Sequence, residues 1–203
     1  MITEYQQQLR ARYLAAPVTT APEPWRPVLD NRTPIGGLQG IGFGIHPDTG
    51  QDLVMVTSLD GHGLFDTVTG AKIARDRDPD PATSTPDAAP DLSCPGLGPL
   101  CGTRVQIAGL FGGGLHSTSG DGWTVDVVTA EWPHERVILS SDGGAHKGEP
   151  GGTWWHILHS SYSTLRAAGF SPTGRTLAVA TSSDLTLWTQ PSPSGERWRR
   201  HPR

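Results

Sequence analysis

Apolar residues alternate with glycine or polar residues in a series of short segments between Leu38 and Trp188. A repeat of two is typical of β-strands that bury one face, and residues that favour turns separate these segments. The segments that we predict to be strands are residues 38–46, 52–58, 62–66, 71–75, 103–109, 123–129, 136–140 and 154–159, followed by strands within 169–188. The pattern therefore predicts one all-β domain over residues 35–190.

The predicted strands group into meanders, in which consecutive strands pair through short turns. Residues 38–75 predict four strands, and residues 169–188 predict a strand, a turn, a strand, a turn and a strand. Together with the strands between them, they favour about three propeller-like, four-stranded antiparallel meanders. Because closed propellers have about four to eight blades, we expect a partial propeller or one that closes by oligomerisation. A β-sandwich or a twisted antiparallel sheet is the alternative fold.

Residues 1–34 follow a different pattern. The apolar residues in 2–15 fall mostly on one stripe of a helix with 3.6 residues per turn, and Thr3 is suited to cap its start. Such a short helix either covers an exposed core or sheet edge, or is offered to a partner. Five prolines in residues 17–34 predict an extended strap, in which Trp25 is expected to anchor the chain to the domain.

Two further segments are dominated by polar or charged residues. Residues 76–97 are rich in Asp and Pro and are predicted to form a mobile surface loop. Calcium binding is an alternative for this loop, although the regular Asp spacing of an EF-hand is missing. Residues 191–203 form a basic tail around Trp198, a combination that can bind nucleic acid or have no role at all.

Composition and charge limit the classes of function. The chain has 203 residues with 26 glycines, 18 prolines and a formal net charge of −4, which suits a turn-rich β protein and argues against a nucleic-acid partner. No apolar run approaches the length that crosses a bilayer, and no signal-peptide pattern opens the chain, so we expect no membrane partner and a cytoplasmic location. In that compartment Cys94 and Cys101 are expected to be free thiols, although a bridge across the loop between them is geometrically allowed.

Two segments resemble blades of the WD-repeat family of β-propellers. In residues 170–188, a turn, a strand of small and apolar residues, a second turn and a strand that closes with Trp188 match the family's pattern, and residues 46–75 match it less fully. The aligned positions Leu53 and Leu177 are 124 residues apart, close to three repeats of about 41 residues. The chain as a whole is also similar to bacterial proteins of unknown function, a likeness that implies no activity.

A glycine-rich loop of residues 112–121 is the best candidate for chemistry, because no strong catalytic or cofactor motif is present. Consecutive glycines can turn their amide N–H groups toward an anion, and polar side chains beside them can bind a ligand or transfer a proton. The candidate ligand-binding residues are Gly112, Gly113, Gly114, His116, Ser117 and Asp121. An ordinary hairpin turn is the other interpretation. We expect no cofactor and assign no catalytic residue.

Two spacings predict packing rather than chemistry. His156 and His159 lie three residues apart, so on a strand they are expected to face opposite sides and not to share a metal ion. The alternating Gly40, Gly42 and Gly44 are expected to let another backbone or a bulky side chain approach closely.

Adjacent tryptophans provide the candidate partner-binding residues. Trp154 and Trp155 are expected to point to opposite faces of their strand, so that one of them can contact a protein partner. These observations favour a non-enzymatic protein-interaction module, a small bacterial scaffold or adaptor for a toxin, defence or regulatory partner. A homo-oligomer is compatible with this interpretation. The alternative is an enzyme, or a binder of a small ligand or anion, that uses residues 112–121.

Overall fold

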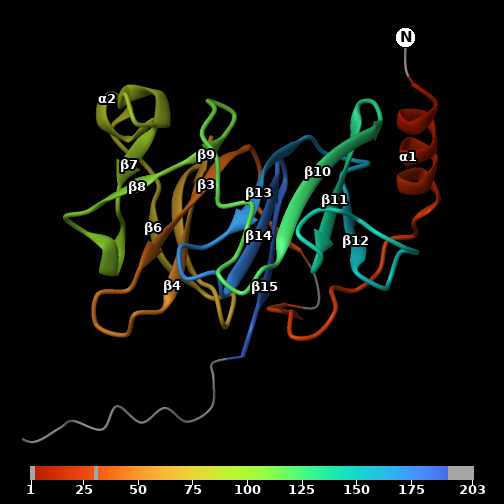
Figure 1. The fold of residues 1–203 in the computed structure, drawn as a ribbon. Coiled ribbons are helices and arrows are strands. Elements are labelled where there is room, and N and C mark those ends of the chain that lie inside the picture. Colours follow the sequence, from red (N-terminus) through yellow and green to blue (C-terminus); the bar gives the residue numbers. More distant parts are fainter. Residues whose placement is uncertain (1–2, 30–31, 192–203) are drawn as a thin grey trace, which may run out of the picture.

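The computed structural model describes residues 3–29 and 32–191 and is built mainly of antiparallel sheets (Figure 1). The first sheet has the strand order β6-β5-β4-β3-β9. Its strands are β3 (Leu38–Ile45), β4 (Asp52–Ser58), β5 (Gly61–Asp66), β6 (Lys72–Asp76) and β9 (Ala108–Gly109). We call it the β3–β6 sheet. The apolar run of β4 is buried on both faces, as a central strand requires.

Two more sheets follow along the chain. The β10–β12 sheet consists of β10 (Thr124–Glu131), β11 (His134–Ser140) and β12 (Trp154–His159). The β13–β15 sheet consists of β13 (Leu165–Phe170), β14 (Thr176–Thr181) and β15 (Asp184–Thr189). Strand β15 also pairs with β1 (Arg26–Pro27) and β2 (Thr33–Pro34). The proline-rich strap therefore supplies the outer edge of this last sheet.

The predicted all-β fold class is confirmed, with its antiparallel meanders and N-terminal helix. Leu53 and Leu177, aligned in the sequence, are both buried in the central strands β4 and β14. Figure 1 shows the three sheets in a row, with the β13–β15 sheet between the other two. The described residues close neither a barrel nor a propeller.

Apolar side chains join the middle sheet to both of its neighbours. The cluster shared with the β3–β6 sheet includes Leu38, Ile41, Val54, Val56, Ala178 and Leu185. The cluster shared with the β10–β12 sheet includes Val125, Val137, Leu139, Phe170, Leu177 and Trp25. Each large apolar side chain that is fully buried contributes about 1.5–3 kcal/mol, so these two interfaces supply much of the driving force for the arrangement.

The Asp- and Pro-rich segment, predicted to be a mobile loop, forms regular elements instead. It contains α2 (Pro81–Ser84), η1 (Pro86–Ala88) and β7 (Ser93–Pro95), and after η2 (Gly98–Leu100) strand β7 pairs with β8 (Arg104–Gln106). Asp80 caps α2 by accepting a hydrogen bond from the Ala82 amide, and Pro86 is buried. Local capping and a second strand from residues 104–106 therefore order a segment that is short of large apolar residues.

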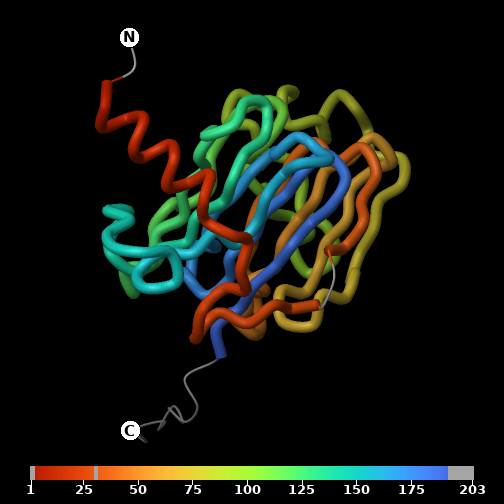
Figure 2. Tube along the Cα trace, turned by 90° about the vertical axis from the view of Figure 1, so that its right-hand side faces the viewer, coloured from red at the N-terminus to blue at the C-terminus, as the bar shows by residue number. Residues whose placement is uncertain are grey.

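The N-terminal helix α1 (Glu4–Ala15) docks on the β10–β12 sheet. Thr3 and Gln6 form the capping box that starts it, as the sequence predicted for Thr3. Arg10 Nε donates to the Ala130 carbonyl oxygen over 2.6 Å, and Tyr13 is buried beneath the helix. Figure 2 shows the chain continuing from the helix along the sheets to the end of β15, and Trp25 is buried there. The predicted anchoring role of Trp25 is confirmed.

Both cysteines are free thiols. Cys94 is buried and donates to the Ser84 carbonyl oxygen over 3.0 Å, and its burial raises the pKa of the thiol to about 11. Cys101 is exposed.

Among the described residues, no helix combines the length and the apolar character needed to cross a membrane. Of the basic tail, residues 192–203 lie outside the described part of the chain.

Candidate functional site

The glycines of the 112–121 loop form a tight turn against the β3–β6 sheet. The amides of Gly109 and Gly112 each donate to the carbonyl oxygen of the other, over 2.8 and 3.1 Å. Gly113 has a φ of +79° and packs on the Ile107 carbonyl group, whereas Gly114 faces open space. The Gly112 amide is therefore engaged within the turn rather than free to bind an anion.

The polar residues of the same loop are spread along its length. The His116 carbonyl oxygen accepts from the Phe170 amide and the Ser117 carbonyl oxygen accepts from the Val125 amide, so the backbone here extends the neighbouring sheets. Both side chains are exposed. Asp121 accepts hydrogen bonds from Ser119 and from Gln190. Partial burial opposes ionisation of Asp121, but these hydrogen bonds outweigh it and lower its pKa.

The predicted candidates of this loop are thus not brought together. Within residues 3–29 and 32–191, no hydrogen bond links the side chains of His116, Ser117 and Asp121 to one another. A nucleophile needs a base within hydrogen-bonding reach, and Ser117 has none among its described neighbours. The loop pairs with β13 and β10, which agrees with the interpretation as an ordinary turn.

The two candidate tryptophans lie on opposite faces of β12, as their adjacency predicts, but neither is freely exposed. Trp154 is completely buried and packs edge-on against Tyr13, with ring centroids 5.8 Å apart. Trp155 is half-buried beside Trp123 on the other face. Because α1 covers Trp154, this residue holds the helix and does not contact an external partner.

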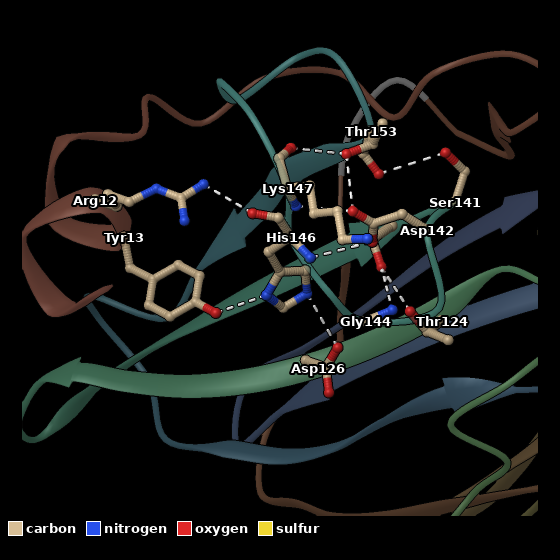
Figure 3. Close-up of polar contacts among 11 residues, drawn as sticks. Arg12, Tyr13, Thr124, Asp126, Ser141, Asp142, Gly144, His146, Lys147 and Thr153 are labelled. Atoms are coloured by element: carbon tan, nitrogen blue, oxygen red, sulfur yellow. Dashed lines mark hydrogen bonds and ion pairs between the residues drawn. The ribbon is translucent and has the colours of Figure 1, made fainter. Parts of the chain in front are cut away.

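His146 fastens the helix to the sheet, as Figure 3 shows. The Tyr13 hydroxyl lies 2.6 Å from Nδ1 of His146, and Nε2 of the same ring lies 3.1 Å from Asp126. Burial, assisted by Asp126, raises the pKa of Tyr13 and favours the protonated phenol. If the ring hydrogen of His146 lies on Nε2, toward the Asp126 carboxylate, Nδ1 accepts a hydrogen bond from the Tyr13 hydroxyl. Asp142 holds the loop by accepting from the amides of His146 and Lys147. A protonated, buried tyrosine suits a structural clasp better than a nucleophile.

A second polar cluster corrects the predicted orientation of His156 and His159. The pairing of β11 with β12 shifts register after Val137, so that His159 is opposite Arg136 while His156 is opposite Ile138. This bulge brings both imidazoles to one face, with ring centroids 5.9 Å apart. No group of three or more metal-ligating side chains is placed to hold an ion in the described part of the chain.

Arg136 is the centre of this histidine cluster. Its guanidinium lies 3.5 Å from Glu131 and 3.3 Å from Nδ1 of His156, a ring nitrogen that is also 2.9 Å from the Ala16 carbonyl oxygen. Burial lowers the pKa of both His156 and His159, and the charge of Arg136 lowers them further. The histidines are therefore neutral at pH 7, and the cluster ties the segment after α1 to β12.

Stability is expected to fall as the pH drops below about 6.5, the pKa of an unperturbed histidine. His62, which is buried in β5, and the pair His156 and His159 all have lowered pKa values in the folded state. The unfolded chain then binds more protons than the folded chain, so acid favours unfolding, by up to about 1.4 kcal/mol per pH unit for each proton. Urea unfolding at about pH 7.5 and about pH 5.5 measures the difference.

The matched variants separate buried from exposed histidines. His156→Gln should lose part of the pH dependence, whereas His116→Gln, at an exposed position, should keep all of it. Equal stability of the parent protein at the two pH values would show that these imidazoles are not protonated preferentially in the unfolded chain.

Among the described residues, the most accessible aromatic side chains lie in two loops that hydrogen bonds between Glu135 and Ser160 bring together. Trp132, in the β10–β11 turn, is 83% exposed, and Tyr162, between β12 and β13, is 99% exposed. Beside them lies a cavity of about 220 Å³ that is lined by Pro133, His134, Ser160, Ser161, Tyr162, Ser163 and Thr164. We call Trp132 and these lining residues the aromatic edge. Exposed aromatic residues of this kind often dominate binding energy at interfaces.

Glu135 holds the two loops of the aromatic edge in place. Its amide donates to Ser160 Oγ over 3.1 Å, and its carbonyl oxygen accepts from the Ser160 amide over 2.9 Å. Its carboxylate also accepts from the Leu165 amide over 3.3 Å. The loops are therefore fixed to β11 and β13 before any partner arrives, which reduces the entropy lost on binding.

The sequence pattern assigned no binding role to Trp132 or to Tyr162. The usable signal was a large aromatic residue within a Pro- or Ser-rich turn, where no apolar neighbour can cover it.

Comparisons of the chain with protein-family models, with curated proteins and with solved structures found no match. The function is therefore inferred from the geometry of the aromatic edge.

Proposed function

We propose that the chain is a non-enzymatic protein-interaction module and that the aromatic edge is its contact surface. The observation that carries the proposal is the near-complete exposure of Trp132 and Tyr162 on loops that are already fixed to the sheet. Exposed apolar surface that is rimmed by polar residues often marks an interaction site, and Trp and Tyr are enriched among the residues that dominate binding energy. The sequence-based interpretation placed the contact on Trp154 or Trp155, and the proposal moves it to the opposite end of β12.

We propose further that the partner segment is extended and proline-rich. Trp132 and Tyr162 offer flat faces on which pyrrolidine rings can pack, as in other aromatic-lined grooves that bind polyproline II helices. The hydroxyls of Ser161, Ser163 and Thr164 make no hydrogen bond within the described residues and are free to donate to peptide carbonyl groups. A proline-rich peptide presents carbonyl acceptors and few amide donors, which matches this set.

The cysteines bear on the proposed cellular location of the module. Two free thiols agree with a cytoplasmic location, and the module is proposed to act as a small bacterial scaffold or adaptor. The WD-like segments 46–75 and 169–188 build two of the sheets in this view, while the aromatic edge lies mainly in the loops after β10 and after β12, between these segments in the sequence. Beside the edge, Glu131 is paired with Arg136 and the Glu135 carboxylate accepts hydrogen bonds from Ser160 and Leu165, so we expect the binding of an uncharged proline-rich segment to depend little on salt.

The test is titration of the full chain with an oligoproline peptide of about ten residues, followed by calorimetry. We expect binding that weakens at least about tenfold, or about 1.4 kcal/mol, in Trp132→Ala and in Tyr162→Ala. Tyr5→Ala is the matched control, because Tyr5 is 71% exposed on α1, far along the sequence from the edge. Its affinity should equal that of the parent protein.

Two results would contradict the proposal. Failure of the peptide to bind would exclude a proline-rich partner, and binding that survives both aromatic substitutions would place the contact elsewhere. Sedimentation of the free chain adds a control, because dimerisation that Trp132→Ala abolishes would mean that the edge binds a second copy. Binding that instead requires His116 or Asp121 would favour the alternative ligand-binding role of the 112–121 loop.

A further inference from the structure

A polar cavity of about 240 Å³ lies between the two WD-like meanders, away from the aromatic edge. One wall comes from the β3–β6 sheet and includes Thr49, Asp52 and Thr67. The other comes from the β13–β15 sheet and includes Thr173, Arg175, Thr176, Thr189 and Gln190. The cavity is small for a ligand site, since drug-sized ligands occupy about 300–1,000 Å³, so it suits a ligand of only a few heavy atoms.

The Asp52 carboxylate is a buried charged group in the lining of this cavity. Asp52 is only 4% exposed. Its Oδ2 accepts hydrogen bonds from Ser171, Thr173 and Thr176, whereas its Oδ1 is buried without a partner. No described Lys, Arg or His lies within ion-pair distance of it. A buried acceptor of this kind, with no compensating cation, is costly unless something donates to it.

Three of the threonine hydroxyls that line the cavity have already committed their hydrogens, whereas Thr49 Oγ1 accepts from the Gln51 amide and keeps its hydrogen. Thr67 Oγ1 donates to the Asp52 carbonyl oxygen over 2.7 Å, and Thr176 Oγ1 donates to the Asp52 carboxylate over 3.2 Å. Thr189 Oγ1 donates to the Arg175 carbonyl oxygen over 3.4 Å. Because a hydroxyl has one hydrogen and two lone pairs, these three hydroxyls can now offer only acceptors to the cavity.

Two donors on the cavity wall, Arg175 and Gln190, form hydrogen bonds with groups other than Asp52. Arg175 is half-exposed on the wall, and its guanidinium donates to the Pro191 carbonyl oxygen over 3.1 Å. Gln190 donates its amide to Asp121 over 2.9 Å. Both donors thus point to partners other than Asp52 Oδ1. Gln51, which also lines the cavity, has a buried Nε2 donor without a partner among the described residues, so the cavity holds one unpaired neutral donor and one unpaired charged acceptor that no cation offsets.

We propose that this cavity binds a small primary amine as its ammonium ion, with Asp52 Oδ1 as the anchoring acceptor. An ammonium group has three donors and no acceptor, so it complements a carboxylate surrounded by threonine lone pairs. A neutral polyol fits less well, because it brings no positive charge to offset the buried Asp52 carboxylate. The amine can be a free small molecule or the side chain of a lysine, and the two sources share this chemistry.

The sequence alignment of the meanders locates the site on equivalent positions. With the offset of 124 residues between Leu53 and Leu177, Asp52 aligns with Thr176 and Thr49 aligns with Thr173. All four line the same cavity. The acidic residue is present in one meander only, so Asp52 is the single anionic group of the lining and suits a single cationic group, while Arg175, the basic residue of the lining, directs its guanidinium to the Pro191 carbonyl oxygen.

The experiment is a nuclear magnetic resonance titration of the full chain with ethylamine at constant ionic strength and neutral pH. We expect saturable shifts of the amides of Asp52, Thr67 and Thr176, with a dissociation constant of about 1 mM for so small a ligand. Nα-acetyl-lysine amide, used in parallel, distinguishes a lysine side chain from a free amine. Tetramethylammonium, which has charge but no donor, and glycerol, which is neutral, should not bind.

Asp52→Asn should weaken ethylamine binding at least tenfold, because it removes the charge and turns a donor toward the cavity. Thr67→Val keeps the Asp52 carboxylate but removes the hydroxyl that holds the Asp52 backbone, so it should weaken ethylamine binding by a smaller factor. This variant replaces Asp52→Asn as the test if Asp52→Asn does not fold. No ethylamine-dependent shift at about 100 mM, or equal binding of tetramethylammonium, would overturn the proposal. Binding that Asp52→Asn leaves unchanged in a folded protein would overturn it as well.

Discussion

Trp25→Ala is expected to lower the free energy of unfolding by about 3–5 kcal/mol, a large part of the stability of a domain of this size. Trp25 is almost fully buried, and its ring packs against Phe170 with centroids 5.4 Å apart and edge-on against Trp123. The substitution opens a cavity in the cluster that joins the strap to the middle sheet. Urea unfolding followed by circular dichroism measures the loss.

Trp132→Ala is the matched control for this prediction. The same substitution at an 83% exposed position should change the free energy of unfolding by no more than about 0.5 kcal/mol. Equal effects of the two substitutions would mean that the strap does not pack as described. The control also shows that a loss of peptide binding in Trp132→Ala does not come from unfolding.

Gly42→Ala is expected to cost about 3 kcal/mol, because β3 has no room for a side chain at this position. A Cβ added there would overlap the Gln106 carbonyl oxygen and would lie 2.8 Å from Val105 Cγ1, closer than real Cβ atoms approach. The obstacle is largely backbone of β8, so relief requires the strands to move apart. The measurement is again the free energy of unfolding in urea.

Gly36→Ala provides the comparison for Gly42→Ala. Gly36 has open space around its Cα and needs no left-handed backbone, so a methyl group should be neutral or slightly stabilising there. If Gly42→Ala proved as well tolerated as Gly36→Ala, the close approach of β8 to β3 would not exist in solution.

The architecture was largely predictable because the signals are local. The alternation of apolar residues and the turn residues predicted the meander that the structure shows between Leu38 and Asp76. The side chain of Thr3 predicted the start of the N-terminal helix, because threonine can cap a helix. The close packing at Gly42 was likewise expected from alternating glycines in a strand. Each of these inferences depends on neighbours within a few residues along the chain, so a single sequence suffices.

The errors arose where distant segments decide the structure. The bulge at β12 depends on its pairing with β11, so the alternation rule placed His156 and His159 on opposite faces when they share one. Trp154 was predicted to be a possible partner contact, but helix α1, about 140 residues earlier in the chain, covers it. The Asp- and Pro-rich segment is ordered by pairing with residues 104–106. Long-range contacts of this kind leave no periodic pattern in the sequence.

The candidate sites were less predictable than the fold, for the same reason. Trp132 and Tyr162 lie 30 residues apart, and their loops come together through the pairing of β11 with β12 and the hydrogen bonds of Glu135 to Ser160 and Leu165. Asp52 and Thr176 meet across two sheets, and no local motif marks either residue as part of a cavity. Exposure and an unpartnered buried oxygen, which identify these sites, are properties of the folded chain alone.

The most direct measurement is a nuclear magnetic resonance titration of the full chain with the oligoproline peptide. Binding at the aromatic edge predicts saturable shifts of the Trp132 indole N–H and of the amides of His134, Ser161, Tyr162 and Ser163, with little change at His116 or Asp121. Shifts that are absent at saturating peptide, or that centre on the 112–121 loop, would contradict the proposed contact surface.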